Sequence, residues 1–246
     1  MKIALLADLH GNADALREVE KELALAAPDE LWFLGDAVGK GPDNDVCFDW
    51  VRANCQKWIA GNWDRGVGLR LFPGDGIYQR QLGEERLKHF LNLPIEETVW
   101  FSGLRVRLMH GRPVLQELPI GIEPADTLEE MFTNQAGEKC DAVIYADMHR
   151  QLLRTMRFGT LYNIGSVGNA TGVKGAFFGI LEGEPGEKEA PFSLRLCRVP
   201  FDPEPVIERA RLFFGEDDHR YASFAHELRT GQYVPRGVGT PPKNFG

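Results

Sequence analysis

The sequence contains little cysteine and no closely spaced cysteine pair. Its four cysteines, Cys47, Cys55, Cys140 and Cys197, form no C-x-x-C motif. Such wide spacing is typical neither of a disulfide framework nor of a zinc site built from thiolates. We therefore expect reduced thiols in a cytoplasmic protein.

Long hydrophobic runs are also absent. No apolar stretch approaches the ~20 residues that are needed to cross a bilayer. The first apolar run, residues 3–7, is too short for the core of a signal peptide and is better explained as a strand. We expect no association with a membrane.

Positive charge is in deficit, with 28 Lys and Arg against 36 Asp and Glu and a net charge of −8. Generic binding to nucleic acid needs a basic face that displaces counterions, so a nucleic-acid partner and a nuclease activity are disfavoured. A local basic pocket remains possible. Lys40, Arg65, Arg112 and Arg150 could be solvated surface charges, or together they could hold a phosphate group.

The chain also lacks the motifs of enzymes that use a protein nucleophile. It has neither a Gly-x-Ser-x-Gly elbow nor the C-x-x-x-x-x-R loop of cysteine-dependent phosphatases. We therefore expect no covalent intermediate on serine or cysteine.

The first part of the chain alternates between strand and helix patterns. Strands are predicted at residues 2–8, 31–35 and 57–60, with helices at residues 13–26 and after Asn44. Such βαβ units join parallel strands by right-handed crossovers. The carboxyl ends of the three strands should therefore meet at one edge of a sheet, where sites of α/β proteins lie.

The second half is richer in strands. It contains a helical pattern at 77–91, a hairpin at 98–109, strands at 142–145, 160–164, 175–181 and 193–199, and helices at 203–214 and 218–229. We predict an α/β fold, with two mixed sheets packed face to face and helices outside, in a four-layer α/β/β/α sandwich. One domain should span residues 1–233, followed by a loosely held Gly- and Pro-rich tail at 234–246.

Five short segments, each at the end of a hydrophobic run, carry the residue types that bind hard divalent cations. They are Asp8-Leu9-His10, Gly35-Asp36, Gly61-Asn62, Met109-His110-Gly111 and Asp147-Met148-His149. Singly, each could be an ordinary turn after a strand. Together they predict a metal site, because strand ends can converge on one pocket.

The order of these segments resembles the calcineurin-like metallophosphoesterases, whose pattern runs Asp-x-His, Gly-Asp, Gly-Asn-His-Asp/Glu, His, Gly-His-x-His. The resemblance spans roughly residues 1–200 and implies the same four-layer architecture. Within this family, the segment 163–168, Asn-Ile-Gly-Ser-Val-Gly, is similar to the small prokaryotic phosphodiesterase branch.

The resemblance also implies two divalent ions. One ion would be held by Asp8, His10, Asp36 and His149, and the other by Asp36, Asn62, His110 and Asp147, so that Asp36 bridges the two. A metal-bound hydroxide would then attack phosphorus without a protein nucleophile.

Two residues depart from the family pattern. Asp147 stands where a His is usual, which should favour hard ions such as manganese or iron over softer ones, leaves zinc or nickel as the alternative, and makes the second ion less certain. Trp63 replaces the His that assists the departing alkoxide; it could stack on a nucleobase or simply fill space. Asp64 thereby loses its usual partner, and we expect it to pair with Arg65 or Arg112.

These patterns predict a metal-dependent phosphoesterase that hydrolyses a phosphodiester or a nucleotide phosphoanhydride, with a small phosphate ester or nucleotide as its ligand. Arg112, Arg150 and Trp63 are the candidate substrate contacts. The alternative is a metallophosphoesterase-fold scaffold or nucleotide sensor with little catalysis, a role that the Trp63 and Asp147 departures permit. The oligomeric state stays open.

Overall fold

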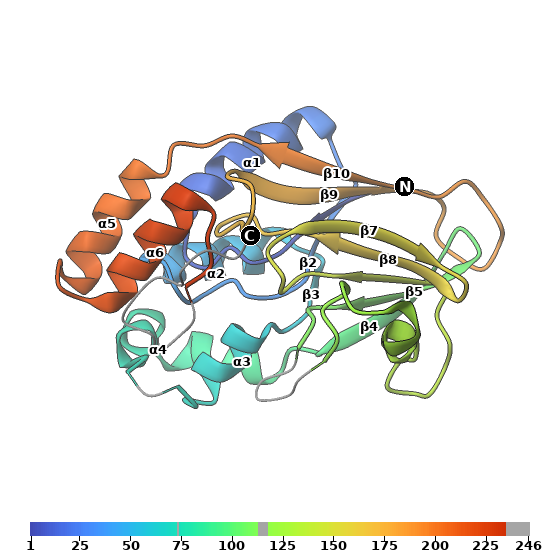
Figure 1. The fold of residues 1–246 in the computed structure, drawn as a ribbon, viewed down its shortest axis with the longest axis horizontal. Helices are drawn as coiled ribbons and strands as arrows, with labels where there is room; N and C mark the ends of the chain where they lie inside the picture. Colours follow the sequence, from blue (N-terminus) through green and yellow to red (C-terminus); the bar gives the residue numbers. More distant parts are fainter. Residues whose placement is uncertain (73, 113–117, 235–246) are drawn as a thin grey trace.

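The computed structural model describes residues 1–72, 74–112 and 118–234. Two five-stranded sheets pack face to face, with helices on their outer faces (Figure 1). The predicted four-layer α/β/β/α architecture is therefore confirmed. The tail predicted at 234–246 lies, apart from Val234, outside the described residues.

The first sheet has the order β10-β9-β1-β2-β3. Its centre is β1 (Lys2–Leu6), which runs parallel to β2 (Glu30–Phe33), and β2 runs parallel to β3 (Lys57–Trp58). On the other side, β9 (Ala176–Glu182) pairs antiparallel with both β1 and β10 (Ser193–Val199). The parallel half of this sheet is the half that the βαβ pattern predicted.

The second sheet has the order β4-β5-β6-β8-β7. The hairpin of β4 (Glu96–Phe101) and β5 (Leu104–Met109) continues through the parallel strands β6 (Ala142–Tyr145) and β8 (Gly159–Ile164). The edge strand β7 (Gln151–Met156) pairs antiparallel with β8 and was missed by the sequence prediction. As an edge strand it has no fully buried residue, which leaves little hydrophobic signal in its sequence.

Six α-helices surround the sheets in the described part of the chain. They are α1 (Ala13–Ala26), α2 (Asn44–Asn54), α3 (Asn62–Gly68), α4 (Gly76–Leu91), α5 (Glu204–Phe214) and α6 (His219–Thr230). The helix α1 begins where expected, because the Asn12 side chain accepts a hydrogen bond from the Ala15 N–H. The short α3 was not predicted from the sequence. No helix among the described residues is long and apolar enough to span a membrane.

The strand β1 is buried on both faces. Ile3 and Leu5 face the second sheet, where they meet Leu108 and Ile144. Ala4 and Leu6 face the helices instead. A strand that is covered on both sides has a continuous apolar sequence, and its polar continuation from Asp8 onward therefore begins inside the protein.

The outer face of the second sheet is covered by a 3-10 helix, η1 (Ala125–Phe132), which sequence patterning did not predict. Its buried residues, Leu128, Met131 and Phe132, pack against Val143 and Leu161 of the sheet. This layer is thinner than the layer of α-helices that covers the first sheet.

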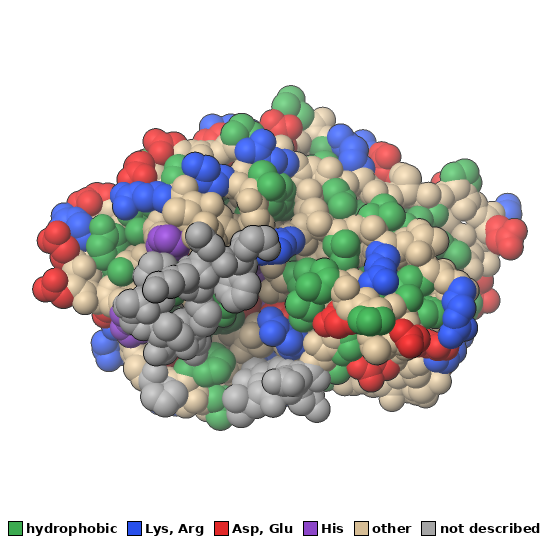
Figure 2. Space-filling view, in the orientation of Figure 1, with side chains coloured by type: hydrophobic (Ala, Val, Ile, Leu, Met, Phe, Trp, Pro, Cys, Tyr) green, Lys and Arg blue, Asp and Glu red, His purple; other side chains and the backbone are tan. Residues whose placement is uncertain are grey.

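The helices α5 and α6 lie side by side at one end of the molecule, while the strands of both sheets extend toward the other end (Figure 1). Acidic and basic side chains are interspersed over the face shown in Figure 2.

Candidate metal centre

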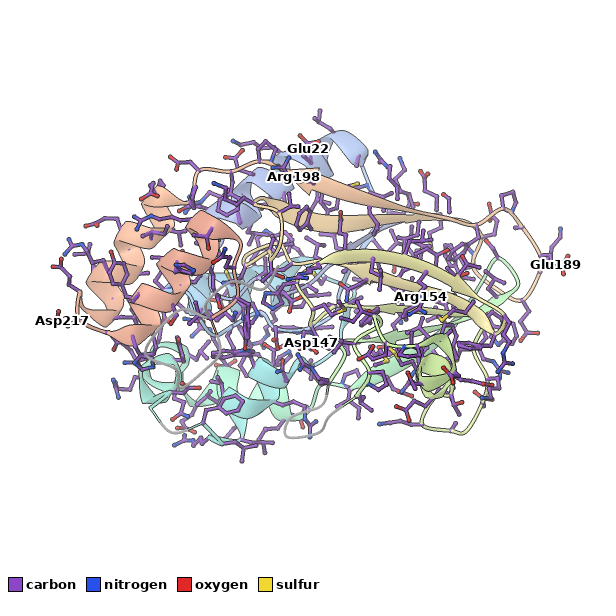
Figure 3. All side chains as sticks on the ribbon, in the orientation of Figure 1. Glu22, Asp147, Arg154, Glu189, Arg198 and Asp217 are labelled. Atoms are coloured by element: carbon purple, nitrogen blue, oxygen red, sulfur yellow. The ribbon has the colours of Figure 1, made fainter. Side chains whose placement is uncertain are left out.

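The structure brings the five predicted segments together. Asp8 and His10 follow β1, Asp36 follows β2, Asn62 begins α3 after β3, His110 follows β5, and Asp147 and His149 follow β6. Two groups of His and Asp atoms, each within 4.8 Å of one another, could hold a metal ion: Asp8 with His10 and His149, and Asp8 with Asp36 and His110. Figure 3 shows Asp147 in the middle of the molecule, whereas Glu189 and Asp217 lie at its outer ends.

The backbone of this region is strained. Five of the predicted ligands have positive φ angles: Asp8 (54°), His10 (47°), Asp36 (60°), Asp147 (65°) and His149 (57°). Residues with side chains seldom adopt this left-handed region, and such residues cluster at functional sites. The strain turns the side chains that follow β1, β2 and β6 toward a common point.

Two glycines of the motifs are needed for close approach. A Cβ on Gly35, whose φ is +98°, would lie 2.5 Å from the backbone nitrogen of Gly61. A Cβ on Gly61 would lie 1.9 Å from Oδ1 of Asp36. Glycine is therefore required in the Gly35-Asp36 and Gly61-Asn62 motifs, because the two segments pack too closely against each other and against Asp36 to leave room for a Cβ.

In the first group, two imidazoles face each other. His10 Nδ1 lies 3.1 Å from the Val38 carbonyl and His149 Nδ1 lies 2.5 Å from the Asn169 carbonyl, so both Nδ1 atoms carry the proton and donate it. The two Nε2 atoms are then lone-pair acceptors only 3.0 Å apart. Asp8 Oδ1 lies 3.7 Å from the first and 3.5 Å from the second.

If one imidazole were protonated, its Nε2–H could donate a hydrogen bond to the other Nε2, but burial of both rings opposes protonation. Burial lowers the pKa of His10 well below its ordinary value and that of His149 to about 4, and Lys40 contributes to both shifts. Two neutral imidazoles with facing lone pairs beside a carboxylate form a donor set suited to a divalent cation.

The second group centres on His110. Its Nδ1 donates to the Leu34 carbonyl at 2.6 Å, and its Nε2 lies 3.3 Å from Asp36 Oδ2 and 3.8 Å from Asp8 Oδ1. A carbonyl that fixes the tautomer of a histidine is the usual support of a metal-binding imidazole. Burial by itself lowers the pKa of His110, but the carboxylates of Asp36 and Asp8 raise it well above its ordinary value.

Several buried polar atoms here lack hydrogen-bond partners among the described residues. They are both carboxylate oxygens of Asp8, Oδ1 of Asn62 and Nε2 of His110. Burial raises the pKa of Asp8 well above its ordinary value. Unpartnered buried polar atoms are costly in a folded protein, so these four atoms fit a group that binds cations.

Asp36 and Asp8 both lie between the two groups. Asp36 Oδ2 is 3.6 Å from His10 Nε2 and 3.3 Å from His110 Nε2, while Oδ1 accepts the backbone N–H of Trp63 at 2.8 Å. The position suits the bridge that was expected of Asp36, although Asp36 belongs to the second group and Asp8 is the residue common to both groups. The assignment of ligands to each ion stays a prediction.

Asp147 is engaged by Arg112. The guanidinium Nε lies 2.5 Å from Oδ2 of Asp147 and Nη2 lies 3.2 Å from Oδ1. Although burial opposes the shift, the hydrogen bond from Arg112 lowers the pKa of Asp147. Asp147 Oδ1 remains 3.9 Å from His110 Nε2. Arg112 therefore competes with any cation for the carboxylate that replaces the family histidine.

Asp64 does not form the ion pair that was expected of it. Its fully buried carboxylate accepts hydrogen bonds from the backbone N–H groups of Asp36, Ala37 and Gly61, at 2.9, 3.0 and 3.2 Å. Burial raises its pKa to about 7, and the neighbouring Asp36 adds to the rise. Asp64 instead ties the segment after β2 to the start of α3. Sequence reasoning missed this role because backbone donors leave no signature in the side chains.

The segment 163–168 also supports the site from behind. Asn163 donates to the Ala146 carbonyl at 2.6 Å, and Ser166 donates to the Asp8 carbonyl at 2.9 Å. Both side chains are fully buried. These contacts favour a structural role for this turn over contact with a phosphate group.

A pocket of about 280 Å³ opens beside the two groups. Its walls carry all three predicted substrate contacts, together with residues that the sequence did not suggest. The lining residues are Asp36, Lys40, Asn62, Trp63, Arg112, Ile120, Ile122, Asp147, Met148, His149, Arg150, Thr171 and Tyr233. Arg65 is not among the described residues that line it.

The Trp63 ring lies at the edge of the pocket. It packs so closely over Gly39 that a Cβ there would lie 2.1 Å from the ring, and its centroid is 5.7 Å from that of His10 and 5.9 Å from that of Phe72. The ring is held by packing, yet one part of it borders the pocket. Arg150 donates to Thr171 at 3.2 Å.

Comparison with known families identifies this arrangement. The model of the calcineurin-like phosphoesterase superfamily domain matches residues 1–185. The chain belongs to this superfamily. The family and fold predicted from the motif order are thereby confirmed, and the Asp and His groups are suited to metal binding.

Individual relatives are distant. An uncharacterized protein of Methanocaldococcus jannaschii is 26% identical over 84% of this chain and 90% of its own length. A symmetrical bis(5′-nucleosyl)-tetraphosphatase of Erwinia tasmaniensis is 27% identical over 66% of this chain and 59% of its own length. The crystal structure of a metallophosphoesterase from Sphaerobacter thermophilus matches with a TM-score of 0.70 at 19% identity, over 94% of this chain and 99% of that one.

Metal binding at His110 should release a proton. Because its raised pKa keeps His110 protonated at neutral pH in the metal-free protein, Nε2 must lose its proton before it can ligate, and affinity should rise with pH. Calorimetric titration of the metal-free protein with Mn²⁺ at pH 7, in buffers of different ionisation enthalpy, should show release of about one proton.

The matched control is a pair of histidine variants. His110→Asn should abolish this proton release, whereas His149→Asn should leave it, because His149 is already neutral at pH 7. An unchanged proton count in His110→Asn would show that the proton comes from another group.

Removal of Arg112 should strengthen binding of the second ion. Arg112→Ala frees both oxygens of Asp147, so elemental analysis after dialysis against limiting Mn²⁺ should find more metal per protein than in the wild type. Arg150→Ala is the control, because it removes the same charge from the pocket wall without touching Asp147. Equal metal content in the two variants would exclude competition at Asp147.

Proposed function

We propose that this protein is a metal-dependent phosphoesterase that cleaves a phosphodiester or a nucleotide phosphoanhydride. The observation that carries the proposal is the pair of overlapping Asp and His groups, buried and with unpartnered polar atoms, beside a pocket that Asp36 and His149 line. Membership of the phosphoesterase superfamily supports it.

The residues that would hold two divalent ions are Asp8, His10, Asp36 and His149 for one, and Asp36, Asn62, His110 and Asp147 for the other. When bound, such ions lower the pKa of a water molecule and neutralise negative charge on phosphate oxygens. We propose manganese or iron as the ions, because carboxylate and imidazole donors suit them and no thiolate is near.

The chain's own cations lie where a phosphate group would enter. Lys40, Arg112 and Arg150 line the pocket, and the protein offers them from three different segments. Arg112 has a side chain that is 43% exposed, so its guanidinium can reach both Asp147 and a ligand in the pocket. We propose that these three side chains orient the phosphate group and balance its charge.

An anhydride or an activated ester suits this pocket better than a simple alkyl ester. Trp63 occupies the position of the family's proton donor, and an indole supplies no proton near neutral pH. General acid catalysis is commonly worth about 10²–10⁴ in rate, so a good leaving group should matter here. The distant relative named as a bis(5′-nucleosyl)-tetraphosphatase supports a nucleotide anhydride as a candidate substrate.

A second candidate function follows from the Arg112–Asp147 pair. If this pair prevented binding of the second ion, the protein could bind a nucleotide with little hydrolysis and act as a sensor or scaffold. We favour the enzyme, because the donor atoms of Asp8, His10, Asp36 and His110 are all in place. We further propose a small phosphate ester or nucleotide, and not a nucleic acid, as the ligand, and a cytoplasmic location.

Asp36→Asn should lower metal content and hydrolysis together. The change removes the charge that lies between His10 and His110, so both ions should bind more weakly. The test is elemental analysis combined with the rate of bis-p-nitrophenyl phosphate hydrolysis in Mn²⁺; we expect loss of most of the metal and a fall in rate of at least about 10²-fold. Wild-type protein that binds Mn²⁺ but hydrolyses neither this diester nor a nucleotide anhydride would favour the sensor.

Trp63→His should help esters of poor leaving groups. In the wild type, rates across aryl phosphodiesters should fall steeply as the pKa of the leaving phenol rises, because no side chain protonates the departing oxygen. An imidazole at position 63 should flatten this dependence, whereas Trp63→Phe, which cannot donate a proton, should not. A shallow dependence in the wild type would mean that another group supplies the proton.

A further inference from the structure

The segment that follows α6 reaches the candidate site from outside the family domain. The match to the superfamily ends at residue 185, and α5 and α6 come after it. The helix α6 ends at Thr230, and the next residue, Gly231, has a φ of 72° that turns the chain back. The Gly231 carbonyl then accepts the Gly172 N–H at 2.8 Å, and two residues later Tyr233 lines the pocket.

One buried carboxylate holds this segment in place. Glu227 is only 2% exposed, and its Oε1 accepts the Val234 N–H at 2.8 Å. Its other oxygen, Oε2, accepts from Lys40 Nζ at 2.9 Å and from Asn169 Nδ2 at 2.9 Å. The three donors come from three separate parts of the chain, and each would lose a buried partner without Glu227.

The same carboxylate connects the segment to the metal ligands. Asn169, which donates to Glu227 through its side chain, accepts the Nδ1–H of His149 with its backbone carbonyl. Lys40 follows the Asp36 segment and lines the pocket. The last turn of α6 is therefore connected by hydrogen bonds to the residues that orient the metal ligands.

The aromatic ring of Tyr233 borders the pocket and is half exposed. Its side chain is 49% exposed although it borders the pocket, and Lys40 Nζ lies 5.0 Å from the centre of its ring. A cation at this distance is attracted to an aromatic ring, so Lys40 helps to hold the ring where it borders the pocket. The exposed part of the Tyr233 side chain is available to a ligand that enters the pocket.

Apolar residues contribute to the same pocket from the segment after residue 117. Ile120 and Ile122 line it, and Ile122 is 65% exposed. This segment is pinned, because Glu123 accepts the Ile120 N–H at 2.9 Å and the Gly121 N–H at 2.8 Å. Tyr145 also donates to the Ile120 carbonyl. The apolar side chains are thus held in the pocket by a well-bonded backbone.

We propose that Tyr233, with Ile120 and Ile122, forms a subsite for an aromatic ring attached to the phosphate group of the substrate, and that Glu227 is the positioning residue that places Tyr233 there. The inference rests on the proposed function and extends it, because it assigns the substrate class: phosphodiesters or anhydrides that carry an aryl or nucleobase group. Lys40, beside the Tyr233 ring, faces the charged end of such a substrate.

The test compares two diesters with the same leaving group, p-nitrophenyl phenyl phosphate and p-nitrophenyl methyl phosphate, in Mn²⁺. Since p-nitrophenolate departs from both, the ratio of their kcat/KM values isolates the group that remains on phosphorus. Wild-type protein should prefer the phenyl ester. Tyr233→Ala should reduce this preference roughly three- to tenfold, the range expected for one aromatic pair. Tyr233→Phe should keep it.

The control is Leu212→Ala, which removes an exposed side chain from α5 outside the pocket and should leave the ratio unchanged. Equal ratios for Tyr233→Ala and the wild type would overturn the subsite. So would a wild type that shows no preference for the phenyl ester.

Glu227→Gln tests the positioning role. A Gln side chain has one acceptor oxygen, so it cannot serve Lys40, Asn169 and the Val234 N–H together. The ratio of kcat/KM for the phenyl ester to that for the methyl ester should fall as in Tyr233→Ala. In the double variant of Glu227→Gln and Tyr233→Ala the ratio should fall no further, because both changes remove the Tyr233 ring from the pocket. A loss of thermal stability in Glu227→Gln with an unchanged ratio would show that Glu227 is structural only.

A binding measurement separates failure of this inference from failure of the proposed function. If the wild type hydrolyses neither diester, calorimetric titration of the Mn²⁺-loaded protein with phenyl phosphate and with methyl phosphate still compares the two groups. Tighter binding of phenyl phosphate that is lost in Tyr233→Ala would support the subsite in a protein without hydrolase activity. Equal binding of both by the wild type would reject the subsite.

Discussion

Burial of negative charge at the end of β1 is the constraint on which the site depends. Asp8 has no exposed surface, and neither of its oxygens has a hydrogen-bond partner among the described residues. An unpaired buried carboxylate costs several kcal/mol, on the order of the whole stability of a domain. Burial keeps His10 and His149 neutral, so among the three neighbouring histidines only His110, whose Nε2 lies 3.8 Å from Asp8 Oδ1, can offset part of this cost as a cation. A divalent cation bound among these atoms would offset the cost, because it supplies the missing positive charge and accepts their lone pairs.

Backbone groups, rather than other side chains, hold the ligands in position. The carbonyls of Val38, Leu34 and Asn169 each accept the Nδ1 proton of one histidine and turn its Nε2 inward. The Asp64 carboxylate, in turn, accepts hydrogen bonds from three backbone N–H groups and so joins the segments after β2 and β3. A site that is oriented by the backbone resists displacement, and this rigidity supports the left-handed conformations of the ligand residues.

The pocket combines features that no single motif contains. Its lining includes the carboxylates of Asp36 and Asp147 and the cations Lys40, Arg112 and Arg150. Apolar groups come from the segment around Ile120 and from the segment after α6. A charged group beside an apolar one is the general form of a phosphate bonded to a ring. Arg112 adds an internal cation beside Asp147, one of the residues that we propose for the second ion.

The sequence by itself determined the β-α-β-α-β start, the two-sheet architecture and the set of residues that meet at the strand ends. It could do so because a buried strand has a continuous apolar pattern, and because the residue after such a strand lies at the sheet edge whatever the rest of the chain does. Tertiary structure alone decided the partners of those residues. Asp64 pairs with backbone N–H groups instead of an arginine, Arg112 reaches Asp147 across 35 positions, and Lys40 meets Glu227 across 187. Long side chains and backbone donors can reach many partners, so packing of distant segments, and not local pattern, selects among them.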